Sequence, residues 1–315
     1  MPLRRWVCRR WFCSGATPRR PTSATTRMSI CSTRRAAAAR AVSAWPVRTA
    51  PAPWPRFDPK SSPVIWSICC AMPTRETAKQ VAGIWLPGSE VHLVDMLLHH
   101  SKVGPVDGKG TYQLHKLRAA LAHQPTGRRR VAVDIGAHVG LWSMHLVKAF
   151  AHVHAFEPIP PHGDLWRRNV AASNATLHRT ALGARSATVA MEVPEETTGN
   201  GHVVIGRGGC SSAVPRIPDV SNPDRRDLWL GVPMRTLDSF ALEEVDFIKI
   251  DVEGFERPVI EGAVETILRY RPHVVVEQKG NETAYGEPRN AAVAFLRGLG
   301  MAPVAVISGD WILGW

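Results

Sequence analysis

Two glycines and an acid follow a short apolar segment, and together they could hold a nucleotide-like ligand. Residues 131–135 favour a β-strand, and Gly136 and Gly140 follow, with an amphipathic segment directly after them. Glycine lets the backbone come close to a ligand, and the start of a helix presents free N–H groups. The pattern predicts a strand, a turn and a helix, with a ligand at the carboxyl end of the strand.

The spacing of these glycines excludes two common phosphate-binding loops. The Gly-x-Gly-x-x-Gly pattern of dinucleotide-binding proteins is absent, and no lysine follows the glycines as it does in a phosphate loop. Asp134 instead places a carboxylate before Gly136, which suits a ligand with an amine or cationic end. Glu157 ends the second predicted strand, where a carboxylate can accept hydrogen bonds from both hydroxyls of a ribose. S-adenosylmethionine has both an amine-bearing, cationic end and a ribose with two hydroxyls, and we expect it to be the cofactor.

A second charged group stands at the end of another predicted strand, at residues 246–251. A lysine inside an apolar strand is costly to bury unless it is paired, so Lys249 should reach a carboxylate. Asp251 and Glu253 should lie at the carboxyl edge of the sheet and face the same crevice as Gly136. They could form the acceptor side of a site, or merely a salt-bridged strand end with a helix-capping acid. No metal-binding cluster is expected.

Strands that alternate with helices of about 10–15 residues indicate an α/β fold with a mostly parallel sheet. The predicted strands are 131–135, 151–156, 175–179, 188–193, 232–237, 246–251, 273–277, 303–307 and 310–314. The fourth should be an antiparallel excursion, and the last two an antiparallel edge hairpin. The predicted helices are 111–122 with Thr111 as N-cap, 162–172, 256–270 and 289–299, while 90–100 is a short helix or strand edge. Residues 195–231 read as a long irregular insertion around a possible strand at 202–205.

The first 71 residues carry all of the net charge. They hold 12 Arg and one Lys against a single acid, Asp58, while the rest of the +12 chain is neutral. Their prolines and lack of a steady period predict disorder. They could be an organellar targeting leader, a nucleic-acid-binding tail, or out-of-frame sequence ahead of a true start at Met28 or Met72. We therefore expect a leader (1–71), a helical lead-in (72–127) and a catalytic domain (128–315).

Cysteine usage and hydropathy bear on the compartment. Only Cys210 lies beyond the leader, so no disulfide framework is expected and a reducing environment is indicated. No apolar segment approaches the length of about 18 residues that a membrane helix needs. We expect a cytoplasmic protein with no membrane partner, and organellar targeting by residues 1–71 is the alternative.

Five motifs in order resemble those of the FkbM-type S-adenosylmethionine-dependent methyltransferases. They are Asp134-Ile-Gly-Ala-His-Val-Gly140, Phe156-Glu-Pro158, Asn169, Thr236-Leu-Asp-Ser-Phe240 and Ile248-Lys-Ile-Asp-Val-Glu-Gly-Phe-Glu256, and the resemblance covers about residues 111 to 307. It implies a Rossmann-like seven-stranded methyltransferase sheet with an antiparallel C-terminal edge. It also implies methyl transfer to a hydroxyl of a sugar or natural-product scaffold.

Carried over by position, the family's cofactor-binding residues are Asp134, Gly136, Gly140 and Glu157, and its acceptor-pocket residues are Lys249, Asp251, Glu253 and Glu256. His138 stands where the family usually has Asn, and it could adjust the methionine end of the cofactor site.

The reaction that we expect is in-line attack of an acceptor oxygen on the methyl group. Asp251 would accept or orient the hydroxyl proton, Lys249 would fix its rotamer, and Glu253 would assist. The partner is then a small-molecule or saccharide acceptor, and nucleic acid is not expected for the core. Two alternatives stay open: a methyltransferase-like domain that binds without turnover, and an RNA-modifying or nucleic-acid-binding protein that uses the basic leader. The glycine pattern disfavours an oxidoreductase.

Overall fold

The structure is a computed structural model, and it describes residues 77–125, 127–194, 197–204 and 228–315. The predicted disorder of residues 1–71 lies outside the described residues, as does most of the predicted insertion at 195–231.

Seven strands form the main sheet, in the order β12, β13, β11, β10, β3, β4, β5. Strand β13 runs antiparallel to both of its neighbours, and the other strands run parallel to one another. The mostly parallel seven-stranded sheet with an antiparallel C-terminal edge is therefore confirmed. The strands are β3 (Val131–Ile135), β4 (His152–Phe156), β5 (Ala175–His178), β10 (Val245–Ile250), β11 (His273–Glu277), β12 (Ala302–Ile307) and β13 (Asp310–Gly314).

The strand order reverses between β3 and β10. From β3 the chain continues to β4 and β5 on one side, whereas β10 and β11 lie on the other. In open parallel sheets, ligands bind at the carboxyl ends of the strands where the order reverses. The topology therefore places the expected crevice between Gly136, which follows β3, and Asp251, which follows β10.

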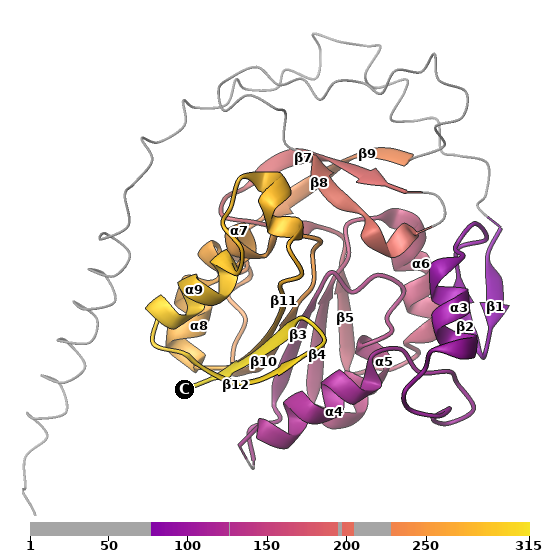
Figure 1. Cartoon of the computed structure of the whole chain (residues 1–315), viewed down its shortest axis with the longest axis horizontal. Coiled ribbons are helices and arrows are strands. Elements are labelled where there is room, and N and C mark those ends of the chain that lie inside the picture. The colour runs from indigo at the N-terminus through magenta and orange to yellow at the C-terminus, as the bar shows by residue number, and fades with distance from the viewer. Residues whose placement is uncertain (1–76, 126, 195–196, 205–227) are drawn as a thin grey trace, which may run out of the picture. The chain divides into compact units, whose positions relative to one another are not determined.

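Helices cover both faces of this sheet (Figure 1). Successive strand residues point to opposite faces, so Ala132 packs with α4 and α5 while Val133 packs with α7, α8 and α9. The helices are α3 (His92–His99), α4 (Leu114–His123), α5 (Ser143–Ala149), α6 (Pro160–Asn169), α7 (Glu256–Glu261), α8 (Val264–Tyr270) and α9 (Ala291–Gly298), with 3-10 turns η1 (Thr198–Asn200), η2 (Asp238–Phe240) and η3 (Asn281–Tyr285). Within the described ranges, no helix has the length and apolar character needed to cross a bilayer.

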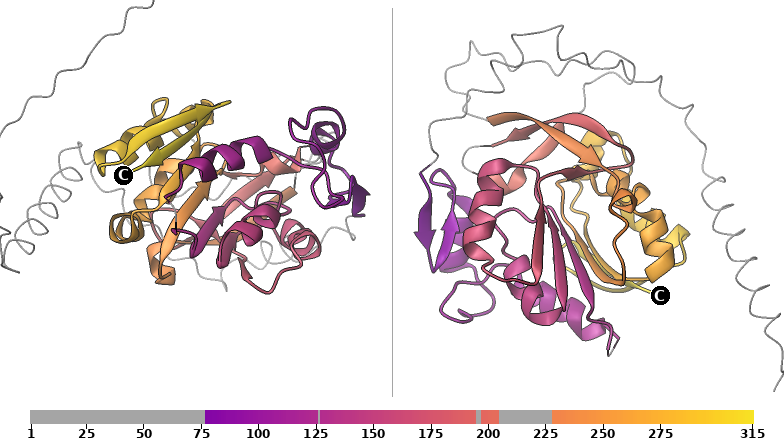
Figure 2. Two further views of the ribbon diagram at one scale, coloured as in Figure 1. Left: turned by 90° about the horizontal axis from the view of Figure 1, so that it is seen from below. Right: turned by 180° about the vertical axis from the view of Figure 1, so that it is seen from behind.

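A second, four-stranded sheet adjoins the main one, as both views in Figures 1 and 2 show. Its order is β6, β9, β7, β8, and β7 pairs antiparallel with both β8 and β9. The strands are β6 (Ala181–Leu182), β7 (Ala187–Val193), β8 (His202–Val204) and β9 (Leu228–Arg235). The antiparallel strand predicted at 188–193 is thus confirmed as β7, and it belongs to this second sheet. The turn η1 connects β7 to β8.

The lead-in differs from its prediction in two details. A hairpin of β1 (Lys79–Val81) and β2 (Ile84–Leu86) precedes α3, and the sequence pattern does not predict it. Helix α4 begins at Leu114, so Thr111 is not its N-cap. The Thr111 hydroxyl donates to the carbonyl of Val103 instead, because a threonine can bond nearby backbone outside a helix as readily as it caps one.

The single helix predicted over 256–270 is two helices, separated at Gly262. A β-carbon on Gly262 would lie 2.1 Å from the carbonyl oxygen of Gly183, so the backbone passes too closely for any side chain. The second helix then starts afresh, with Asp238 accepting hydrogen bonds from the backbone N–H groups of Glu265 and Thr266 at 3.1 and 2.9 Å. Tertiary contact, which helical periodicity does not report, ends the first helix.

Replacing Gly262 by alanine should destabilise the protein by about 1–3 kcal/mol, because the methyl group would overlap the Gly183 carbonyl. Gly298→Ala is the matched control: Gly298 is exposed in α9, and a β-carbon there meets nothing within 4 Å. The control should stabilise by up to about 1 kcal/mol, since alanine is the better helix former. Urea unfolding of both variants measures the difference, and equal effects would contradict the close contact.

Candidate functional site

A cavity lies at the carboxyl ends of β3, β4 and β10, where the main sheet meets the smaller one. Its polar wall contains Gly136, His138, Glu157, Thr198, Asp251 and Glu253, and its apolar wall includes Phe156, Ile159, Leu182, Met191 and Phe255. Five of the nine residues selected from the sequence therefore line one cavity. Asp134, Gly140, Lys249 and Glu256 do not.

The two glycines of the loop have different roles. Gly136 has φ +71°, and a β-carbon there would lie 1.9 Å from the carbonyl oxygen of Asp251. Its absent side chain thus lets the end of β10 approach the end of β3. Gly140 has φ +93°, and a β-carbon there would lie 2.5 Å from Val170 and 2.9 Å from Trp166. Gly140 therefore allows the loop to pack against α6, behind the cavity.

Glu157 is buried and holds the glycine loop in place. One carboxylate oxygen accepts the backbone N–H of His138 at 2.8 Å, and the other accepts that of Ile159 at 2.9 Å. The ring of His162 lies 3.4 Å from the second oxygen. Each carboxylate oxygen has a second lone pair, so Glu157 can accept further hydrogen bonds from a molecule in the cavity that it lines.

Lys249 neutralises two acids, as its place in an apolar strand predicts. Its ammonium group lies 3.5 Å from Asp134 and 3.7 Å from Asp251, and it donates to the carbonyl of Gly136 at 2.8 Å. Asp134 is fully buried and also accepts the hydroxyl of Ser143 at 2.6 Å. Asp134 and Lys249 thus form the support beneath the loop rather than the wall of the cavity.

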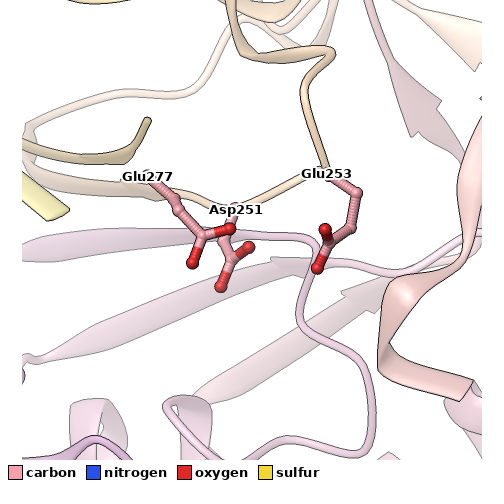
Figure 3. A group of neighbouring side chains, drawn as sticks. All are labelled: Asp251, Glu253 and Glu277. Carbon is pink, nitrogen blue, oxygen red and sulfur yellow. The ribbon is translucent and has the colours of Figure 1, made fainter. Parts of the chain in front are cut away.

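Three acids converge near the carboxyl ends of β10 and β11. One oxygen from each of Asp251, Glu253 and Glu277 lies within 4.8 Å of the others. Figure 3 shows the carboxyl group of Asp251 beside that of Glu277, with Glu253 on its other side. The sequence analysis did not select Glu277. It ends β11 next to β10, and Glu157 directly follows β4, so the same strand-end signal was available.

These acids have different pKa values. Burial by itself would raise the pKa of Asp251, but the charges of Lys249 and Lys279 keep it below the ordinary value. Burial and the charge of Asp251 raise the pKa of Glu253 to about 7 and that of Glu277 to about 8, although Lys279 also contacts Glu277. Asp251 is therefore the member that stays ionised near neutral pH.

His138 is a neutral side chain in the wall of the cavity. Burial, and then the charges of His162 and Lys249, lower its pKa well below the ordinary value. Its Nε2 atom lies 3.1 Å from the hydroxyl of Thr198, and its ring meets that of His162 edge to face with centroids 4.3 Å apart.

Glu256, which the family resemblance assigns to the acceptor pocket, does not line this cavity. Its carboxylate accepts the backbone N–H groups of Gly254 at 2.8 Å and Val252 at 3.3 Å, and the side-chain amide of Gln278 at 3.1 Å. The N–H groups that it accepts precede α7, so it shapes the turn that carries Glu253 and does not cap the helix.

The sheet order, the glycine loop and the acid that ends β4 define a Rossmann-like methyltransferase fold. Comparison with known proteins then gives the family. The profile of the methyltransferase FkbM domain matches residues 134–300, which is more than half of the chain. The chain belongs to the FkbM methyltransferase family.

Two curated fungal proteins are similar to it. Methyltransferase 1 of Beauveria bassiana is 24% identical over 190 residues, which cover 57% of this chain and 74% of that protein. Methyltransferase sdnD of Sordaria araneosa is 28% identical over 167 residues, which cover 46% of this chain and 64% of that protein.

Among solved structures, methyltransferase FkbM of Methylobacillus flagellatus is 16% identical, with a TM-score of 0.39. The alignment covers 61% of this chain but only 44% of that one, so the chain spans less than half the length of that protein.

The raised pKa of Glu277 predicts how stability depends on pH. The carboxyl group should ionise near pH 4.5 in the unfolded chain but only near pH 8 in the folded one. Between these two pH values the folded state binds one more proton than the unfolded state. The stability that protonated Glu277 contributes is therefore fully present below about pH 4.5 and is lost as the pH rises to about 8. Glu277→Gln cannot ionise, and it should flatten this decline in urea unfolding between about pH 5 and about pH 8.

Glu265→Gln, a change at an exposed position on α8, is the control and should leave the slope as in the wild type. If Glu277→Gln and the wild type declined in parallel, the burial of a protonated Glu277 would be excluded.

Proposed function

We propose that the protein is an S-adenosylmethionine-dependent O-methyltransferase that acts on a hydroxyl group of a sugar or a small natural-product-like molecule. The observation that carries this proposal is one cavity whose wall combines the glycine loop and Glu157 with the acids Asp251 and Glu253. The family of the chain is that of methyltransferases, whereas the cofactor and the acceptor are our inference.

The residues present fit such a cofactor. Glu157 retains lone pairs toward the cavity, as recognition of two ribose hydroxyls requires. Gly136 lines the cavity, and Phe156 and Leu182 offer apolar surface suited to a purine ring. When bound, S-adenosylmethionine supplies a methyl group on a positively charged sulfur.

Asp251 is our candidate for the proton acceptor. Its carboxylate is three-quarters buried and is kept ionised by Lys249, so it can take the proton of an acceptor hydroxyl as that oxygen gains the methyl group. Lys249 contacts Asp134 and the carbonyl of Gly136 as well, and these contacts fix the position of its charge. We assign Lys249 the task of orienting Asp251.

Glu253 supports a polyol-like acceptor. Its raised pKa, near 7, means that the carboxyl group can donate or accept a hydrogen bond at neutral pH. Asn281 holds one of its oxygens at 2.8 Å. A carboxyl group that both donates and accepts, beside an ionised carboxylate, matches neighbouring hydroxyl groups. We therefore favour acceptors with more than one hydroxyl group near the methylated position.

Asp251→Asn should retain cofactor binding and lose turnover by about a hundredfold or more, because an amide cannot accept the proton. Titration calorimetry with S-adenosylhomocysteine measures binding, and methyl transfer to a panel of sugars and hydroxylated natural products measures turnover. Asp164→Asn, at an exposed position on α6, is the control and should match the wild type in both.

Each arm of this experiment can fail separately. An absence of binding heat in the wild-type protein would remove the cofactor assignment. Turnover that survives in Asp251→Asn would remove Asp251 as the proton acceptor. Binding without turnover on every acceptor would favour the non-catalytic binding domain.

A further inference from the structure

Glu90 is a buried acid that lies outside the matched family domain yet reaches the cavity wall. It lies two residues before the start of α3 and has no exposed surface. One of its oxygens accepts the backbone N–H of Leu93 at 2.9 Å. The other accepts both the backbone N–H of Thr198 at 2.8 Å and the Thr198 hydroxyl at 2.6 Å. Three donors around one carboxyl group are what an ionised carboxylate accepts.

These hydrogen bonds determine the direction of the next one. The Thr198 hydroxyl has a single proton, which it donates in the hydrogen bond to Glu90. Toward His138 the hydroxyl oxygen can therefore only accept a hydrogen bond. The Nε2 atom of His138, 3.1 Å away, must then carry a proton. The ring is neutral because its pKa is well below the ordinary value, so it has only this one proton. Nδ1 is left with a free lone pair.

That lone pair is available to a bound molecule. His138 lines the cavity beside Gly136 and Glu157. Glu157 contacts the backbone N–H of His138 rather than its ring, and Nδ1 makes no hydrogen bond to any described residue. His162 meets the ring edge to face and does not occupy the lone pair with a hydrogen bond. An unprotonated Nδ1 attracts N–H donors, whereas a protonated one would repel a cationic amine.

We propose that Glu90 is a positioning residue that acts through Thr198 to hold Nδ1 of His138 unprotonated, as the acceptor for the amino group of the methyl donor. The identity of that ligand rests on the proposed function, whereas the direction of the Glu90–Thr198–His138 chain does not. The hydrogen bonds to Glu90 also anchor η1 to a segment 108 residues earlier in the sequence. The lead-in is thereby part of the site.

Nitrogen-15 NMR of histidine-labelled protein tests the direction of the chain without any ligand. We expect the wild-type protein to show His138 as the tautomer protonated at Nε2. Thr198→Ser retains the hydroxyl and should show the same tautomer, whereas Thr198→Val removes it and should yield a mixture. Glu90→Leu removes the acceptor of the Thr198 hydroxyl proton, so the hydroxyl can donate to Nε2 of His138 and part of the ring population should carry its proton on Nδ1.

A proton on Nδ1 in the wild type would overturn the proposal, and so would identical spectra for Thr198→Val and Thr198→Ser. The wild-type spectrum shows which nitrogen of His138 is protonated even if a variant fails to fold.

Binding of S-adenosylhomocysteine, which has the same amino group, tests the consequence. Thr198→Val should bind it about twofold more weakly than the wild type, because only the fraction of the protein with an unprotonated Nδ1 can accept the amino group, and Thr198→Ser should restore the affinity. Equal affinity in Thr198→Val would overturn the assignment of the amino group. If no form of the protein binds it, the proposed function fails, while the NMR result still decides the role of Glu90.

Discussion

The close approach of two strand ends is the constraint on which this site depends. The backbone at Gly136 passes so near the Asp251 carbonyl that a β-carbon would lie 1.9 Å from it. Because β3 and β10 are neighbours at the reversal of strand order, this contact brings the glycine loop and the acidic group to one cavity. A side chain at Gly136 would separate the two halves of the site, whatever the chemistry of either half.

Buried charge is the second determinant, and it is balanced locally. Lys249 lies between Asp134 and Asp251 and bonds to the loop backbone, so the ionised state of Asp251 and the position of the loop are linked. At Glu253, burial and the charge of Asp251 outweigh the charges of Lys279 and Lys249, and the pKa is raised instead. The site therefore combines an ionised carboxylate with acids that can hold a proton near neutral pH, and this combination suits the recognition of hydroxyl groups.

Much of this could be predicted from the sequence. Short apolar segments and their alternation with helices indicated the strands of the main sheet, and each of Glu157 and Asp251 was found because it stands at the end of a predicted strand. The carboxyl ends of parallel strands lie at one edge of the sheet, so the position of an acid at a strand end also predicted where it would lie in the fold. The apolar surroundings of Lys249 likewise required a carboxylate partner, and the structure provides two.

The tertiary structure alone decided which selected residues face the cavity and which support it. Asp134 and Gly140 are part of the motif, yet Asp134 is buried and accepts a hydrogen bond from Ser143, and Gly140 packs against α6. The close contact of Gly262 with Gly183 and the hydrogen bond from Thr198 to Glu90 both join segments that are far apart in sequence. Periodicity reports which face of an element is buried. It does not report which distant backbone or side chain will lie against that face, because only packing of the whole chain fixes that contact.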